Sequence, residues 1–104
     1  MIEQVFLLAQ NNEHMIEKVI TDENVNFNHM IFNKNEGLPE HFSNSNVYMT
    51  VIRGLVSIGL DEHEIHEYSA GTVLKIPKGI KMNVKNLYDD TLELIVIKAP
   101  APEK

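Results

Sequence analysis

The sequence predicts an all-β domain built as an antiparallel sandwich or barrel. About seven to ten short runs of β-branched and aliphatic residues are separated by Gly, Asn, Asp and Pro, which favour turns. No stretch shows a sustained helical periodicity. The chain has 104 residues, which is enough for one hydrophobic core and too few for two independent cores. These observations predict a single domain over residues 1–104.

The composition is that of a soluble globular protein, with 43% hydrophobic and 23% charged residues. Acidic residues outnumber basic ones by 15 to 9 and the formal net charge is −6, which argues against binding to nucleic acid or to an anionic membrane surface. Because there is no cysteine, disulfides and thiolate metal sites are excluded. The N-terminal apolar run lacks a basic flank and is too short for a signal peptide or a membrane span, so we expect a cytoplasmic protein.

The N-terminal part of the chain is expected to form an arm and the first strands. Residues 5–9 are an apolar run that we interpret as a first strand or an N-terminal arm. Residues 15–20 continue with β-branched residues and end in a polar turn at residues 21–24. Residues 25–33 are predicted to be extended, and their side chains then alternate between two faces. One face carries Val25, Phe27, His29 and Ile31, and the other carries Asn26, Asn28 and Met30.

The clearest strand of the chain is predicted at residues 47–52. It follows a loop at residues 33–39 and a polar segment at residues 40–46 that lacks strong strand formers. Gly54 lies just beyond the strand and breaks it. Residues 55–60 are predicted to be the partner of this strand in a hairpin.

The C-terminal part alternates turns and strands. An acidic turn at residues 61–64 leads into a strand at residues 65–68. A final strand at residues 92–97 is apolar enough to be buried on both faces. Residues 99–104 contain two prolines and are expected to form a stiff, frayed tail. The barrel core is thus expected at residues 25–98, after an arm and first strands at residues 1–24.

Residues 71–86 are the stretch around which the domain is organised. A short strand ends at Pro77, because proline cannot donate a ladder hydrogen bond. Pro77 and Gly79 then bound a tight turn in which the glycine supplies a positive φ. The chain continues as an extended segment whose alternation predicts that Met82 points into the core.

The spacing of Gly71, Pro77, Gly79 and Asn86 matches the second conserved motif of the cupin superfamily, Gly-x5-Pro-x-Gly-x2-His-x3-Asn. The chain resembles a small single-domain cupin, and the resemblance implies a jelly-roll-like barrel, the double-stranded β-helix. Met82 takes the place of the metal-binding histidine of the motif. The resemblance also implies a homodimer formed by strand exchange or sheet augmentation, with residues 2–9 as a candidate for the exchanged segment.

The first cupin motif, Gly-x5-His-x-His-x(3 or 4)-Glu-x6-Gly, is eroded in this sequence. When its closing glycine is aligned on Gly54, the glutamate position falls on Val47, the second histidine on Ser43 and the first histidine on His41. His41 is thus the one expected metal ligand that this sequence retains. Zinc, iron and manganese need three or more nitrogen or oxygen donors in a fixed geometry, so we expect no cofactor. The alternative is a rearranged divalent metal site formed by His41 and His29 with an amide or carboxylate oxygen.

The run His63-Glu64-Ile65-His66-Glu67 resembles a metal motif in composition. In a strand, residues three apart point to opposite sides, so His63 and His66 are not expected to share a ligand. The run follows an acidic turn, and we interpret it as a solvated hairpin edge.

Methionines suggest a soft interior that adapts to ligands of varied shape. The set that could line such a pocket is Met15, Met30, Met49 and Met82. The competing interpretation is that these side chains are ordinary core.

Three functions are compatible with these residues. The first is a barrel that binds a small, partly apolar molecule through His41, Ser43, Asn46, Met49 and Met82, or a purely structural homodimer. The second is a metal-dependent enzyme, of oxygenase or isomerase type, with a rearranged site around His41. The third is a metal-free enzyme that uses His41 as an acid–base group.

Overall fold

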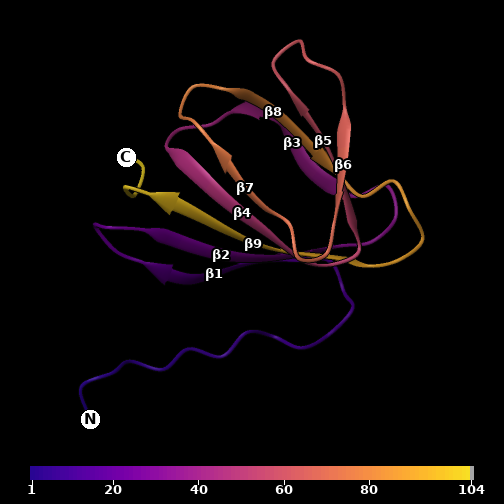
Figure 1. Ribbon diagram of the computed structural model, residues 1–104. Helices are drawn as coiled ribbons and strands as arrows, with labels where there is room; N and C mark the ends of the chain where they lie inside the picture. The colour runs from indigo at the N-terminus through magenta and orange to yellow at the C-terminus, as the bar shows by residue number, and fades with distance from the viewer. Residues whose placement is uncertain (104) are drawn as a thin grey trace.

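The computed structural model describes residues 1–103, which form nine strands in two antiparallel sheets (Figure 1). The five-stranded sheet has the order β1-β2-β9-β4-β7, and the four-stranded sheet has the order β3-β8-β5-β6. The predicted all-β class is confirmed. The strands are β1 (Met15–Thr21), β2 (Asn26–Phe32), β3 (Gly37–Phe42), β4 (Asn46–Arg53), β5 (Leu55–Leu60), β6 (His66–Ser69), β7 (Val73–Ile76), β8 (Lys81–Lys85) and β9 (Leu92–Ala99).

The predicted hairpin between residues 47–52 and 55–60 is wrong. The two segments are strands, β4 and β5, but β4 pairs with β7 and β9 whereas β5 pairs with β6 and β8. The chain crosses from one sheet to the other at Gly54, which has φ 84°. A Cβ atom at Gly54 would lie 2.4 Å from the carbonyl oxygen of Thr91, so this crossing requires glycine for both its conformation and its space.

Strand β3 lies in the segment that was expected to be a loop and a polar stretch. It pairs with β8 alone, at the edge of the four-stranded sheet, and its register shifts between Leu38 and His41. Pro39 lies within that irregular step. The regular hydrogen bonding between the strands is already interrupted there, so the N–H that proline lacks is not needed. Composition misses this strand because pairing with β8, rather than its own propensity, holds it extended.

The hydrophobic core lies between the two sheets. Strands β4, β8 and β9 contribute alternate side chains to it, and Met49 and Met82 are 0% and 2% exposed. The inward orientation predicted for Met82 is therefore confirmed. On β9 the outward-facing Ile95 is also buried, at 8% exposed, as expected for a strand covered on both faces. The core residues are Met30, Phe32, Val47, Met49, Val51, Val56, Ile58, Ile76, Met82, Val84, Leu92, Leu94 and Val96.

The two ends of the chain differ in how they contact the sheets. Residues 1–10 form no strand and trail away from the body as an extended segment, drawn in indigo in Figure 1. At the other end, the backbone N–H of Ala101 donates to the carbonyl oxygen of Asn24 at 3.0 Å. Ser45 also donates its hydroxyl hydrogen to the carbonyl oxygen of Pro100. Within residues 1–103 there is no helix long and apolar enough to cross a membrane.

Candidate functional site

A cavity of about 310 Å³ opens between the two sheets. Three of the methionines singled out in the sequence, Met30, Met49 and Met82, line it, and Val47 and Val96 add further apolar surface. Its polar lining residues are Lys18, Asn28, His41 and Lys98. The cavity therefore combines a soft apolar interior with a few polar groups, which is the usual character of a small-molecule site.

Strand register explains why these side chains meet. Lys18 on β1 lies opposite Asn28 on β2, Asn28 lies opposite Val96 on β9, and Val96 lies opposite Met49 on β4. Residues directly opposite in antiparallel strands project to the same face, so this row lies on one wall of the cavity. On the facing sheet, His41 of β3 lies opposite Met82 of β8.

Asn28 is buried, at 8% exposed, and its Oδ1 atom has no hydrogen-bond partner among the described residues. An amide oxygen can accept two hydrogen bonds. Burying such an oxygen without any partner lowers the free energy of unfolding by about 1–3 kcal/mol. Asn28 lines the cavity, so a molecule entering the cavity can supply the missing donor.

Lys18 and Lys98 bring positive charge to the same cavity. Within residues 1–103, neither ammonium group forms an ion pair with a carboxylate. The protein carries a formal net charge of −6, but no Asp or Glu lines this cavity, and both of its lysines carry positive charge. Neither lysine was singled out from the sequence, nor was Asn28, because no motif marks them.

His41 lines the cavity and is partly buried. Its Nδ1 atom lies 2.8 Å from the carbonyl oxygen of Pro39. A carbonyl oxygen only accepts hydrogen bonds, so Nδ1 carries the proton in the neutral ring and Nε2 keeps its lone pair.

Ser43 and Asn46 hold the turn at residues 77–80 and do not line this cavity. The Ser43 hydroxyl donates to the carbonyl oxygen of Pro77 at 2.7 Å and accepts from the backbone N–H of Ile80 at 2.9 Å. Asn46 Oδ1 accepts from the backbone N–H of Lys78 at 3.2 Å. Gly79 has φ 88° in this turn, as predicted. Of the five predicted ligand-binding residues, the structure brings together His41, Met49 and Met82.

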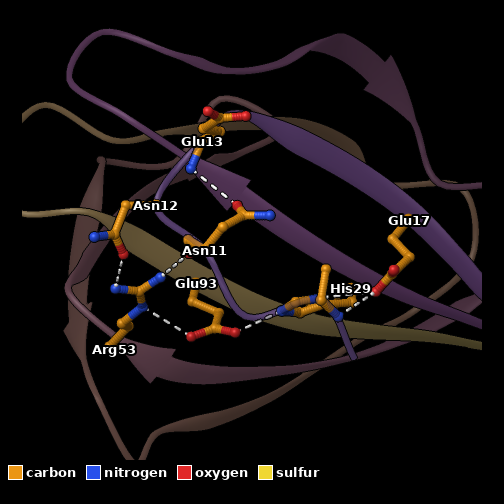
Figure 2. A network of polar contacts seen from close by, with 8 residues as sticks. Asn11, Asn12, Glu13, Glu17, His29, Arg53 and Glu93 are labelled. Atoms are coloured by element: carbon orange, nitrogen blue, oxygen red, sulfur yellow. Dashed lines mark hydrogen bonds and ion pairs between the residues drawn. The ribbon is translucent and has the colours of Figure 1, made fainter. Parts of the chain in front are cut away.

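His29 lies on the other face of β2 and does not meet His41. The ring is fully buried, with Nδ1 3.0 Å from Glu17 Oε1 and Nε2 2.5 Å from Glu93 Oε2 (Figure 2). Glu93 also accepts from the Nε atom of Arg53 at 2.8 Å. Since Asn28 and Met30 line the cavity, strand alternation directs the intervening His29 to the outer face.

The contacts of His29 also affect the ionisation of Glu17. The hydrogen bond from His29, followed by one from the backbone N–H of Ala9, lowers the pKa of Glu17 below its ordinary value. Ionised carboxylates only accept hydrogen bonds, whereas a neutral imidazole has a single N–H. A neutral His29 ring can therefore donate to only one of the two carboxylates, Glu17 and Glu93.

Known proteins place the chain in a family. No family model matches it. Uncharacterized protein MJ0764 of Methanocaldococcus jannaschii is 35% identical over 105 residues, and the match covers 100% of this chain and 90% of the relative. The crystal structure of MJ0764 is described as an RmlC-like cupin family protein with a double-stranded β-helix fold. It matches this structure with a TM-score of 0.92, over 96% of this chain and 93% of that chain. This chain belongs to the RmlC-like cupin family.

More distant cupins agree on the architecture. A cupin superfamily protein of Desulfitobacterium hafniense is 14% identical with a TM-score of 0.76, over 89% of this chain and 83% of that chain. A cupin-2 domain containing protein of Shewanella frigidimarina is 15% identical with a TM-score of 0.69, over 86% of this chain and 84% of that chain. Such identities show the fold alone. The predicted cupin barrel, a double-stranded β-helix, is confirmed.

The donor set of this cupin does not fit the metal ion that its family implies. Within residues 1–103, no three His, Cys, Asp or Glu side chains gather where they could hold an ion. Around the cavity, His41 is joined by the thioethers of Met49 and Met82 and by the amide of Asn28. One imidazole with soft or neutral partners does not meet the needs of zinc, iron or manganese.

A second cavity of this cupin, of about 290 Å³, brings His63 and His66 together. The alternation rule does not apply to this pair, because His63 lies in the turn before β6 and only His66 belongs to the strand. Both histidines are exposed, as expected for a solvated edge. The cavity also contains both charge signs, with Asp61 and Lys75 among its lining residues. No single class of ligand is favoured by that mixture.

Proposed function

We propose that this cupin binds a small, partly apolar molecule in the cavity between its sheets, without a metal ion. The observation that carries the proposal is the buried Asn28 Oδ1 without a partner among the described residues, in a cavity lined mainly by apolar side chains. A buried acceptor without a partner lowers the stability of the free protein, and a ligand that donates a hydrogen bond to it removes that cost.

The size and lining of the cavity support the same function. A volume of about 310 Å³ suits a small molecule, near the lower end of known ligand pockets. Met30, Met49 and Met82 can change rotamer at low cost, so they can fit closely around an apolar body. The lack of three suitable ligands in residues 1–103 argues for binding that does not depend on a metal ion.

Methyl NMR tests the proposal directly. The five methionines comprise three that line the cavity and two, Met1 and Met15, that do not. With ¹³C-methyl methionine, small acids, sugars and aromatics are screened for compounds that shift the Met30, Met49 and Met82 signals. Met49→Phe, which fills the cavity, should abolish those shifts, whereas Met15→Leu should preserve them. Compounds that move only Met1 or Met15, or no signal at all, would contradict the proposal.

A second candidate function is a metal-free reaction with His41 as an acid–base group. It is favoured by the bond from His41 Nδ1 to the Pro39 carbonyl, which leaves the lone pair on Nε2. The group that orients the ring is the Pro39 carbonyl rather than a carboxylate. His41→Gln should then abolish turnover of a compound found in the NMR screen, while the compound still shifts the Met30, Met49 and Met82 signals.

We also propose that the protein is a homodimer in which the N-terminal arm contacts the second copy. Ile2, Val5 and Leu7 are 101%, 63% and 86% exposed on the arm, although their side chains are apolar. The backbone N–H of Ala9 donates to Glu17 Oε1 at 3.3 Å. The residues that precede Ala9 form the arm, which extends away from the body (Figure 1). An apolar extended segment anchored at one end is suited to pack against another sheet.

A further inference from the structure

We propose that the molecule bound in the cavity is a small carboxylate whose acid group lies between Lys18 and Lys98 and beside Asn28. The inference rests on the proposed binding function and specifies the chemical class of its ligand. It does not require any contribution from a metal ion.

Strand pairing places the two lysines on either side of Asn28. Lys18 is directly opposite Asn28 on β1. On the other side, Lys98 of β9 is opposite Asn26, two residues from Asn28 along β2 and therefore on the same face. Direct cross-strand neighbours have Cβ atoms about 4.5–5.5 Å apart, and diagonal neighbours about 7–8 Å. Flexible lysine side chains can thus converge on a single group beside the Asn28 amide.

The positive charges of Lys18 and Lys98 favour an anion beside Asn28. Within the described residues, no carboxylate pairs with Lys18 or Lys98. Two like charges at one cavity repel each other, and the lining of this cavity contains no carboxylate to offset them. A bound carboxylate relieves that repulsion and forms charge-assisted hydrogen bonds to both. A neutral head group would leave the repulsion in place, and a cation would increase it.

The Asn28 side chain adds a second requirement. Its amide provides both an acceptor and donors, and the unpartnered Oδ1 needs an N–H or O–H from the ligand. Ionised carboxylates have no such hydrogen to give. A carboxylate with a neighbouring hydroxyl, such as a 2-hydroxy acid, would satisfy both the lysines and Asn28. The rest of the molecule would be an apolar chain against the methionines.

A matched series of probes tests the head group separately from the apolar chain. Hexanoate, hexanamide, hexylamine and 2-hydroxyhexanoate are titrated into the full chain while the Met30, Met49 and Met82 methyl signals are followed. Hexanoate should bind about tenfold more tightly than hexanamide, and 2-hydroxyhexanoate more tightly still. Hexylamine should be the weakest of the four. The advantage of hexanoate should shrink between about 50 and 500 mM salt, because ions screen the lysine charges.

Lysine variants identify the groups responsible. Lys18→Gln and Lys98→Gln should each weaken hexanoate binding about five- to tenfold and leave hexanamide within about twofold. Lys85→Gln is the matched control, because Lys85 is an exposed lysine on β8 that does not line the cavity. Its hexanoate affinity should equal that of the unchanged chain.

The outcomes separate this inference from the proposed function. If hexanamide binds as tightly as hexanoate, or Lys85→Gln weakens hexanoate as much as Lys18→Gln does, the carboxylate assignment is overturned while binding in the cavity stands. If none of the four probes moves the cavity methionines, and the broader screen also finds no compound that does, both proposals fail together.

Discussion

Two buried asparagines of this cupin differ in how their amides are satisfied. Asn86, which is fully buried, donates from Nδ2 to the carbonyl oxygens of Phe32 at 3.1 Å and Asp90 at 2.8 Å. Its Oδ1 accepts from the backbone N–H of Tyr88 at 3.0 Å. Asn28 has no partner at Oδ1 within the described chain. The Asn86 amide therefore stabilises the fold, whereas the unpartnered amide oxygen of Asn28 destabilises it.

The same substitution should have opposite effects at these two residues. Asn28→Leu should raise the free energy of unfolding by about 1 kcal/mol, because it removes a buried acceptor without a partner. Asn86→Leu should lower it by about 3 kcal/mol, because it leaves several backbone groups unsatisfied. Urea denaturation measures both. A loss of stability in Asn28→Leu would mean that the Asn28 amide is already satisfied, for instance by water, in the free protein.

Ionisation of Glu17 should contribute to stability above the ordinary carboxyl range of pH. Its pKa is lowered in the folded chain by His29, then by the Ala9 N–H, and Glu93 and Arg53 complete the charged cluster around the ring (Figure 2). A lowered folded-state pKa adds stability that is present above the unfolded pKa. That stability is lost as the pH falls through the folded pKa.

Glu17→Gln should therefore flatten the acid side of the stability profile. In the unchanged chain the free energy of unfolding should fall between about pH 5 and pH 3, and the variant should show a shallower fall. Asp22 and Glu36, whose pKa values are also lowered by backbone hydrogen bonds, keep part of the slope in the variant. Denaturant unfolding at several pH values provides the measurement, with Glu3→Gln on the exposed arm as control. Equal slopes in all three proteins would refute the role of Glu17.

At the scale of elements, two glycines with positive φ place different demands on the fold. Gly54 has φ 84° at the crossing between the sheets, where a Cβ atom would meet the backbone of Thr91. Gly79 has φ 88° in the turn before β8, with no atom within 4 Å of its would-be Cβ. Gly54 is thus constrained by conformation and space, whereas Gly79 is constrained by conformation alone.

Alanine substitutions should separate these two demands. Gly79→Ala should cost about 1 kcal/mol, the penalty for a side chain in the left-handed region. Gly54→Ala should cost about 3 kcal/mol, because the Thr91 backbone must also move. Thermal or urea unfolding of both variants is sufficient. Similar losses at the two sites would show that the contact with Thr91 is relieved at little cost.

For the whole molecule, the N-terminal arm at residues 1–8 stands out because six of its side chains are large, apolar and exposed. Removal of residues 1–8 should convert a dimer of twice the 11.9 kDa monomer mass into a monomer with the barrel intact. Light scattering coupled to size exclusion reports the mass, and circular dichroism reports the fold. Val5→Asp combined with Leu7→Asp is the full-length test of the same surface. A monomeric full chain, or a truncated chain that stays dimeric, would contradict the role of the arm.

The interior of the barrel could be anticipated from sequence in part. Alternation along β8 predicted that Met82 points inward, and Met82 is buried. The same alternation along β2 separated His29 from Asn28 and Met30, but it could not say which of the two sets faces the cavity. Hydrophobicity does not decide it either, because Ile31 is buried on the outer face while the polar Asn28 lines the cavity.

The sequence by itself determined the all-β class, most strand positions and the turn at Gly79, because these depend on residues that are close together along the chain. Tertiary structure alone decided that β4 and β5 belong to different sheets, that β3 is a strand, and that Lys18, Asn28 and Lys98 share one cavity. The physical reason is that strand pairing joins segments far apart in sequence. Which face of a strand is inward then depends on what covers the other face.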